Sequence, residues 1–387
     1  MEAIHSLGIL SLNRNIDENA GFLLTNKNGS YCSFYNAPSS RYQGLFYFDE
    51  KVMSMYKLID NIEIAGNSDV SRLKNGFYFI ERKKEDAVES FIMPKGFNSM
   101  IYELSNDNEI SLFLDCKAST DNREWGRCYE ISEEKGCIIV KFTKKTDRRE
   151  DSTDGKEEFT LCLAIKSDKI AYTKIGRWTE RHYSYDEERN SPPFKRYVYD
   201  ALRIDGSKFV FSMSKSRNDA IKECEHVFNN IHEIKNREKE DFLNLLKSDS
   251  IKKIYKNGRI SKEIKIAYIN AFNSLGNLVI GNKNKSIVSE FGELASEAKL
   301  RIRRNDAHPH STGIFAGLPW FFQFWARDTL ISLKALSRIN SEFSKKILFE
   351  YLSRICNDGR LLNLIGQHNS KNLGNSDAHG WLFLRCK

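Results

Sequence analysis

Hydrophobic and polar residues alternate along most of the first half of the chain. Short segments rich in Phe, Tyr, Val and Ile are separated by turn residues, a pattern typical of antiparallel strands. The clearest segments are GFLLTN, RYQGLFYFDE, NGFYFIER, SLFLDC, GCIIVKFTKK, EFTLCLAI, KRYVYDALRI and KFVFSMS. Their spacing predicts an antiparallel β-sandwich over residues 1–215. The Asp205-Gly206 pair, which separates the last two segments, predicts a hairpin turn.

The hydrophobic period becomes helical after Ser216. From Arg217 to Leu246 the apolar residues predict one or two helices with a polar face, and we interpret residues 216–249 as a helical linker. Residues 250–387 are expected to form an α-helical domain, with helices near 261–280, 329–336, 341–355 and 378–387. The expected fold class is therefore multidomain β + α.

Composition narrows the class of protein. Of the 387 residues, 40% are hydrophobic and 12% aromatic, which suffices for sizeable cores. The net charge is +8, but acidic and basic residues are interspersed without a nucleic-acid-binding motif, so we interpret the charge as a solubilising surface. Neither a membrane span nor a signal peptide is evident, and the eight cysteines form no CxxC pair. We expect a cytoplasmic protein with reduced cysteines, no metal and no cofactor.

The segment PWFFQFWARDTLISLKAL (319–336) combines two indoles with an Arg–Asp pair at the start of a predicted helix. Aromatic faces stack on sugar rings, while Arg and Asp side chains hydrogen-bond hydroxyl groups from fixed directions. A sugar-binding subsite is therefore expected from Trp320, Trp325, Arg327 and Asp328. A structural explanation stays open, in which Asp328 caps the helix, Arg327 is its ion-pair partner and the aromatic residues are core.

A second segment, LGNSDAHGWLFLR (373–385), repeats this design. Asn375 and Asp377 precede another predicted helix, and Trp381 shares a helix face with Asp377 because it lies four residues later. Two helix N-termini that each carry an Asp and a Trp can converge on one polyhydroxylated ligand if the helices pack side by side. The structural alternative is again an N-cap Asp beside a core Trp. The triplet His308–His310 has no third ligand at a suitable spacing, so we interpret it as a loop.

Together these motifs resemble the catalytic domain of glycogen debranching enzymes of the amylo-α-1,6-glucosidase type. PWFFQFWARDTLISL, DGRLLN and NSDAHGWLF are similar to that family's aromatic-rich helix and its N-x-DA-x-x-W pattern. Near the N-terminus, FLLTNKNGSYCSFYNAPSSRYQGLFYF is similar to the opening of the family's β domain, with its LTN-x-x-G-x-Y and R-Y-x-G-L elements. The sequence departs from the family pattern at Gln323-Phe324 and His379-Gly380.

The resemblance implies an (α/α)6 barrel akin to the glucoamylase fold and inverting hydrolysis of an α-1,6-linked glucose in glycogen or a limit dextrin. It also implies that Arg327 and Asp328 bind hydroxyls of the terminal glucose. Trp320 and Trp325 would shape the pocket, and its other side would be lined by Asn375, Asp377 and Trp381.

An inverting glycosidase needs an acid and a base on carboxyl groups about 6.5–9.5 Å apart. In the family, both follow the N-x-DA-x-x-W helix. We therefore expect no catalytic residue in this chain, an incomplete barrel, and a second polypeptide that completes it. Residues 329–336 and 378–386 would then bury apolar faces against that polypeptide.

Other interpretations stay open. The chain is part of a split enzyme, a fragment of a longer reading frame, or a non-catalytic α-glucan-binding or regulatory subunit. For a binding subunit, the aromatic residues of 42–48 would form the platform, although alternation favours the core for most of them. A self-sufficient enzyme would need Asp328 and Asp377 as its catalytic pair. Both lie at predicted helix N-termini, where the dipole favours the charged carboxylate and hydroxyl binding over acid catalysis.

Overall fold

The computed structural model consists of two compact units, which are described separately. It describes residues 5–8, 10–16, 19–66, 69–146, 155–169, 171–280, 312–338, 340–356, 358–365 and 377–386. Unit 1 comprises Met1–Asn26, Ser30–Tyr47 and Met55–Asn270, and unit 2 comprises Lys27–Gly29, Phe48–Ser54 and Ala271–Lys387. Among the residues described, no helix has the length and apolar character needed to span a membrane.

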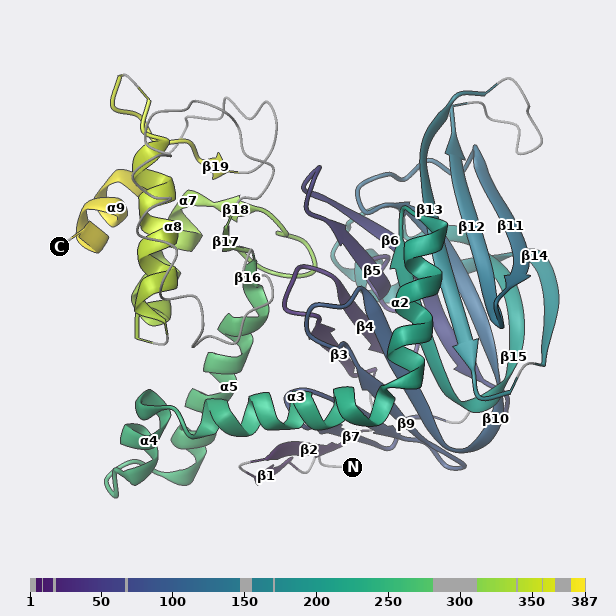
Figure 1. Cartoon of the computed structure of the whole chain (residues 1–387), viewed down its shortest axis with the longest axis horizontal. Helices are drawn as coiled ribbons and strands as arrows, with labels where there is room; N and C mark the ends of the chain where they lie inside the picture. Colours follow the sequence, from purple (N-terminus) through teal and green to yellow (C-terminus); the bar gives the residue numbers. More distant parts are fainter. Residues whose placement is uncertain are drawn as a thin grey trace. The chain divides into compact units, whose positions relative to one another are not determined.

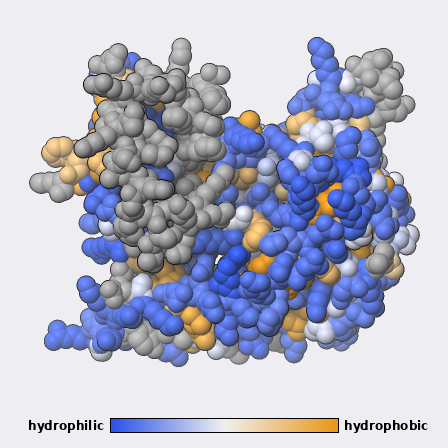
Figure 2. All heavy atoms as spheres, in the orientation of Figure 1, coloured by the Kyte–Doolittle hydropathy of each residue, from blue (hydrophilic) through white to orange (hydrophobic). Residues whose placement is uncertain are grey.

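Unit 1 is built on antiparallel strands that are followed by helices, so the predicted mixture of β and α structure is confirmed (Figure 1). The strands are β1 (His5–Gly8), β2 (Ser11–Asn15), β3 (Gly21–Thr25), β4 (Tyr31–Tyr35), β5 (Gly44–Asp49), β6 (Ser54–Ile64), β7 (Arg72–Asn75), β8 (Ile80–Lys83), β9 (Val88–Ile92), β10 (Ser99–Ala118), β11 (Arg127–Glu134), β12 (Cys137–Lys145), β13 (Glu157–Ser167), β14 (Tyr172–His182) and β15 (Lys195–Ser214). The helices are α1 (Ser184–Glu188), α2 (Arg217–Asn229), α3 (Ile231–Leu246) and α4 (Asp249–Lys256), and the boundary between the two units falls within α5 (Lys262–Leu278). Figure 2 shows that hydrophilic residues dominate the visible face of these strands.

The long strands β10 and β15 organise unit 1. The first part of β10 pairs with β9 and its second part with β6, while the first part of β15 pairs with β14 and its second part with β13. The two strands also pair with each other over most of their length. Strands β10 and β15 each change partner midway. Their neighbours β6, β9, β13 and β14 therefore contribute with them to one apolar core, which includes Phe34, Ile110 and Phe211. The sandwich remains our interpretation of this arrangement.

The hairpin predicted at Asp205-Gly206 is wrong. Both residues lie inside the continuous strand β15 and pair with β10. The glycine allows a close approach instead, because a Cβ atom on Gly206 would lie 2.6 Å from Asp168 Oδ1. That carboxylate oxygen accepts hydrogen bonds from the Ser207 and Lys208 amides at 2.9 and 3.1 Å. A side chain at position 206 would displace the carboxylate from these amides.

The segment NGFYFIER does not form the single strand that was expected. Strand β7 ends at Asn75 and β8 begins at Ile80, with a turn between them. Phe77 has a φ of 69°, in the left-handed region, and its amide donates a hydrogen bond to Asn75 Oδ1 at 2.8 Å. The Gly76 amide closes the turn on Phe79 O at 2.9 Å. The Asn-Gly pair is therefore a turn signal that outweighs the aromatic residues after it.

Helices α2 and α3 occupy the range expected to hold one or two helices, with a break at Asn230. The Ser216 side chain caps α2 by accepting a hydrogen bond from the Asp219 amide at 3.3 Å. Helix α2 packs on β12, β13 and β15 through a second apolar cluster that includes Ile221 and Val227 (Figure 1). Helix α2 is thus part of the packing of unit 1, and the boundaries 1–215, 216–249 and 250–387 stay predictions.

In the described part of unit 2, the helices α7 (Ala326–Leu336), α8 (Ser341–Ser353) and α9 (Ala378–Cys386) pack against one another. Its short strands are β16 (Val279–Ile280), β17 (Gly313–Ile314), β18 (Phe324–Trp325) and β19 (Leu364–Ile365), paired as β16 with β17 and β18 with β19. These helices agree with the helical ranges expected from the sequence, while the (α/α)6 barrel stays a prediction.

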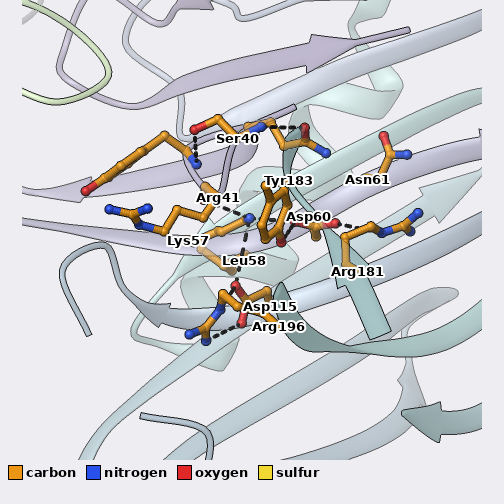
Figure 3. Close-up of polar contacts among 12 residues, drawn as sticks. Ser40, Arg41, Lys57, Leu58, Asp60, Asn61, Asp115, Arg181, Tyr183 and Arg196 are labelled. Atoms are coloured by element: carbon orange, nitrogen blue, oxygen red, sulfur yellow. Dashed lines mark hydrogen bonds and ion pairs between the residues drawn. The ribbon is translucent and has the colours of Figure 1, made fainter. Parts of the chain in front are cut away.

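Charged residues form a buried cluster in unit 1, so the charge is not confined to a solubilising surface (Figure 3). Lys57 Nζ lies 2.6 Å from Asp60 Oδ1 and 3.8 Å from Asp115 Oδ2. The Arg196 guanidinium donates to both oxygens of Asp115, each at 3.1 Å. Burial opposes ionisation of Asp115, but the charges of Arg196, Lys117 and Lys57 outweigh it and hold its pKa well below the usual range.

Lys117 is a further buried lysine of this cluster. Within the described structure its ammonium nitrogen is buried and makes no hydrogen bond. Burial lowers the pKa of Lys117 to about 7; the Asp115 charge opposes this effect, and the charges of Arg196, Lys57 and Arg41 add to it. The charged form of Lys117 therefore costs folding free energy, because the same group is fully hydrated in the unfolded chain.

We expect Lys117→Met to raise the free energy of unfolding at pH 7 by about 1–4 kcal/mol, since methionine fills the space without a charge. The pKa of Lys117 is lower in the folded chain (about 7) than its ordinary value of 10.5. The wild-type fold therefore bears the full penalty below pH 7 and gains stability as the pH rises from 7 to 10.5. The variant lacks this gain.

Denaturant unfolding across that pH window measures both effects. Lys141→Met, at a partly exposed position of β12, is the matched control. A Lys117→Met variant with the same pH slope as the wild type would contradict the account.

Candidate functional site

Some aromatic residues of the segment before α7 lie in the core, and others lie at the surface. Phe322 and Phe324 are buried, and Phe324 stacks on Phe315 with ring centroids 5.5 Å apart. Trp320 and Trp325 are half-buried. The core explanation therefore holds for the two phenylalanines, whereas both indoles keep part of their surface accessible.

Local hydrogen bonds hold the two indoles in place. Gly317 and Phe321 exchange backbone hydrogen bonds of 3.0 and 2.7 Å, which close a turn that carries Trp320. Trp325 Nε1 donates a hydrogen bond to Gln323 Oε1 at 3.3 Å. Gln323, where the sequence departs from the family pattern, thus orients the second indole.

Helix α7 begins directly after Trp325, which occupies its N-cap position and provides no side-chain cap. Arg327 is exposed and Asp328 is half-buried in the first turn. The proposed capping role is therefore wrong for Asp328, since that residue lies inside the helix. Within the described part of the chain, Arg327 and Asp328 form no ion pair with each other, so the charged groups keep their hydrogen-bonding capacity.

Strand β17 fixes the underside of this helix start. Thr329 Oγ1 donates a hydrogen bond to Ile314 O at 3.2 Å. A Cβ atom on Gly313 would lie 2.6 Å from the Phe324 ring, so only glycine allows that ring to pack here. The first turn of α7 is thereby anchored on two sides by buried contacts.

A turn at Asp358-Gly359 holds the start of α9. Gly359 has a φ of 82°, and Asp358 Oδ1 accepts a hydrogen bond from the Arg360 amide at 3.0 Å. The Leu361 amide donates to His379 Nε2 at 3.0 Å, and Gly359 O lies 3.1 Å from the same nitrogen. Because His379 is the second residue of α9, this turn is fastened to the N-terminus of that helix.

The same segment continues to the start of α7. The Ala326 amide donates to Asn363 O at 2.9 Å. One residue on, β19 pairs antiparallel with β18, with Leu364 opposite Trp325. The segment 359–365 therefore connects the N-termini of α7 and α9, which lie some fifty residues apart in the chain.

Two further contacts show how the helices run. Arg385 Nε donates to Leu330 O at 2.7 Å, which places the last turn of α9 beside α7. Tyr351, near the end of α8, lies close to the start of α7: burial raises its pKa, and the Asp328 carboxylate acts in the same direction. Helices α7 and α9 thus begin at the end of unit 2 where α8 finishes.

The second group of predicted residues lies at the start of α9. Asp377 is exposed and directly precedes the helix, and its carbonyl accepts a hydrogen bond from the Trp381 amide at 3.2 Å. Trp381 is half-buried, with the Arg385 guanidinium 5.6 Å from its ring centroid. Asn375 and the His308–His310 triplet lie outside the described residues.

Sequence reasoning missed the positioning roles of His379 and Gln323. Both were noted only as departures from a family pattern, and a lone polar residue carries no spacing signal. Over the described ranges, no group of three or more His, Cys, Asp and Glu side chains could hold a metal ion. The arrangement instead offers carboxylates, a guanidinium and indole faces, the groups that bind hydroxyl-rich ligands.

These contacts bring the side chains at the N-termini of α7 and α9 to one end of unit 2. Residues 283–387 match the model of a family described as amylo-alpha-1,6-glucosidase. No curated protein matches the chain. The match supports a glycosidase of the glycogen-debranching type in this part of the chain, and it includes both helix N-termini and the segment between them. The resemblance of the N-terminal part stays a prediction.

We expect His379→Ala to accelerate amide hydrogen exchange at Leu361 and to destabilise unit 2 by about 0.5–1.5 kcal/mol, the usual net value of one hydrogen bond. His379→Gln is the matched control, because its side-chain oxygen can still accept from that amide. Equal exchange at Leu361 in the wild type and in His379→Ala would show that the histidine does not hold the turn.

Proposed function

We propose that unit 2 carries the glucose-binding part of an amylo-α-1,6-glucosidase site that acts on the branches of glycogen or a limit dextrin. The observation that carries this proposal is the joining of two helix N-termini, each with an Asp and a Trp, by segment 359–365. That joining supports the convergence of both groups on one ligand. The family match of residues 283–387 supports the reaction class.

Each side chain has a role that its chemistry suits. The Asp328 carboxylate accepts hydrogen bonds from two glucose hydroxyls, and the Arg327 guanidinium donates to a third oxygen. Trp320 and Trp325 provide apolar faces for the sugar ring. On the other side, Asp377 and Trp381 repeat the pairing, with Asn375 expected beside them.

The position of Asp328 and Asp377 suits binding better than catalysis. Hydrolysis with inversion needs one carboxyl protonated on the glycosidic oxygen and one ionised beside the attacking water. Both residues lie at helix N-termini, in equivalent positions that suit hydrogen bonding to sugar hydroxyls. We therefore propose that these two aspartates bind hydroxyls, and that the acid and the base come from a second polypeptide.

Exposed apolar residues support the need for that polypeptide. On α9, Phe383 and Leu384 are 69% and 52% exposed. Ile331 on α7 is exposed as well. Figure 2 shows hydrophobic residues at the outer end of α9. Burial of such side chains against another helix would contribute roughly 1.5–3 kcal/mol each, so we propose that this face contacts the second polypeptide.

The second candidate function is glucan binding without hydrolysis. The aromatic platform considered for it in residues 42–48 loses support, because Phe46 and Phe48 are buried. A purely binding role would therefore use the same side chains at the starts of α7 and α9. The two candidates differ only in whether a partner brings carboxyl groups to those side chains.

We expect Asp328→Asn to weaken binding of a maltooligosaccharide about ten- to hundredfold, because a charged hydrogen bond contributes about 1.5–3 kcal/mol. Trp325→Ala should weaken it similarly by removing a stacking face. Isothermal titration calorimetry with the full chain measures both. Glu342→Gln, at an exposed carboxylate in the first turn of α8, is the matched control for charge. Unchanged affinity in both Asp328→Asn and Trp325→Ala would place the sugar elsewhere.

We expect the double substitution Phe383→Ser and Leu384→Ser to lower the fluorescence of the apolar dye ANS bound to the chain, because it removes accessible apolar surface. Ile264→Ser, at another exposed apolar position in α5, is the control. Should the control lower the signal as much as the double variant, the α9 face would not be a distinct contact surface.

A further inference from the structure

Two exposed aromatic residues are neighbours on the surface of unit 1. Among the described residues of this unit, the exposed large aromatic side chains are Trp125, Tyr185 and Tyr197, with 36%, 38% and 48% of their surface accessible. Trp125 lies in the loop between β10 and β11, and Tyr197 lies near the start of β15. The Tyr197 amide donates a hydrogen bond to Glu124 Oε1 at 2.9 Å, so this loop is joined to the strand. Single exposed aromatic residues need no explanation, whereas neighbouring ones mark a candidate binding surface.

A buried guanidinium group fixes the position of these two residues. Arg127 Nη1 donates a hydrogen bond to Tyr197 O at 2.6 Å, and Arg127 Nε donates to Glu124 O at 3.2 Å. The same guanidinium lies 4.1 Å from the centroid of the Trp178 ring and 3.5 Å from Asp115 Oδ1. The loop and the strand are therefore held together from the interior of unit 1.

The register of β14 with β15 places polar groups beside Tyr197. Glu180 pairs with Tyr197, and Trp178 pairs with Tyr199. Paired residues, and residues two apart on a strand, share one face of a sheet, so these side chains lie on the same face. Lys195, two residues before Tyr197, places its Nζ 3.4 Å from Glu180 Oε1, and both charged side chains are exposed. The Tyr197 ring is thus flanked by a carboxylate and an ammonium group.

The Trp125 indole is supported on its inner side. The ammonium group of Lys144 is buried, donates a hydrogen bond to Trp125 O, and lies 5.9 Å from the centroid of the indole ring. Gly126, the next residue, has a φ of 65°, in the left-handed region that favours glycine. The indole is therefore held before a ligand binds, which reduces the entropy lost on binding.

We propose that Trp125 and Tyr197 form a second glucan-binding surface, on unit 1, which stacks against glucose rings of an α-glucan chain while Glu180 and Lys195 hydrogen-bond its hydroxyl groups. The choice of ligand rests on the function proposed for unit 2, whereas the surface itself rests on contacts within unit 1. A glycogen particle carries many chains. A second binding surface on the same molecule therefore raises the affinity for the polymer, because the second binding event becomes intramolecular.

The chemistry of this surface favours a sugar over an apolar partner. A glucose ring presents a face of C–H groups surrounded by hydroxyls, which matches an aromatic ring flanked by charged groups. An apolar partner that covered Tyr197 would also cover Glu180 and Lys195, and the desolvation of these charges would oppose its binding. Hydroxyl groups can replace the water molecules that hydrate both charges, so a sugar avoids this cost.

Tyr185, the third exposed aromatic residue, provides a contrast. It lies in α1, and the Arg189 guanidinium lies 5.1 Å from the centroid of its ring. A cation therefore already occupies one face of this ring. Because Tyr185 is exposed to a similar extent as Trp125, it serves as a matched control for the loss of an aromatic side chain.

The test is co-sedimentation of the full chain with glycogen. A background variant with Trp325→Ala and Asp328→Asn lacks the sugar-binding groups proposed for unit 2 and is expected to retain measurable affinity. Adding Trp125→Ala and Tyr197→Ala should weaken this remaining binding at least about tenfold, whereas adding Tyr185→Ala should leave it unchanged. Absence of binding by the background variant, or equal binding after loss of the two unit 1 rings, would overturn the inference.

Variants that keep the rings separate stacking from folding. Trp125→Phe and Tyr197→Phe retain flat aromatic faces and should bind glycogen more tightly than the two alanine variants, with a similar midpoint of denaturant unfolding. Equal losses of affinity in the phenylalanine and alanine variants would contradict a stacking role for these rings.

The same measurements distinguish this inference from the function proposed for unit 2. If only the unit 1 substitutions weaken binding, the second surface stands and the unit 2 site does not; if only the unit 2 substitutions weaken it, the reverse holds. Competition then tests the class of ligand. Maltoheptaose is expected to displace glycogen from the background variant, and cellohexaose is not. Equal displacement by both sugars would overturn the assignment of an α-glucan.

Discussion

The backbone contacts of segment 359–365 are the constraint on which the proposed site depends. One end of this segment hydrogen-bonds to His379 at the start of α9, and the other pairs with Trp325 at the start of α7. Both helices therefore present their first turns at the same end of unit 2. A helix N-terminus favours carboxylate anions and hydroxyl oxygens because its amide groups point outward. In the proposed function, two such ends, each with an Asp and a Trp, contact more groups of one ligand than either end contacts alone.

Unit 1 contains charged residues in its interior. Its strands enclose Lys57, Asp115 and Arg196, which are paired with one another in the interior, while Lys117 is left without a hydrogen bond in the described structure. Replacing buried ion pairs by apolar residues is often neutral or stabilising, so such a cluster is weak evidence for stability alone. Its members come from β6, β10 and β15, and their pairing fixes how these strands align.

The sequence predicted elements well where the signal was local. GFLLT and CIIVKFTKK form strands, and the helical ranges near α5, α7, α8 and α9 agree with the hydrophobic period. Failures arose where distant contacts decided the outcome. Asp205-Gly206 continues a strand because β10 pairs with it and Asp168 occupies the space beside the glycine. The buried lysines Lys57 and Lys117 resemble surface residues in the sequence, because only the packing of the strands around them shows that they are buried. For the proposed site, motif spacing selected Trp325 and Asp328 as candidates, whereas the contact of His379 with Leu361 could be seen only in the fold.

The release of free glucose from a glycogen limit dextrin tests the central claim most directly. The chain would be assayed alone and together with the polypeptide encoded immediately downstream. We predict release only from the mixture, with Asp328→Asn reducing the rate in that mixture. Release by the chain alone would contradict the account and make Asp328 and Asp377 candidates for the catalytic pair again. No release in either case would favour glucan binding without hydrolysis.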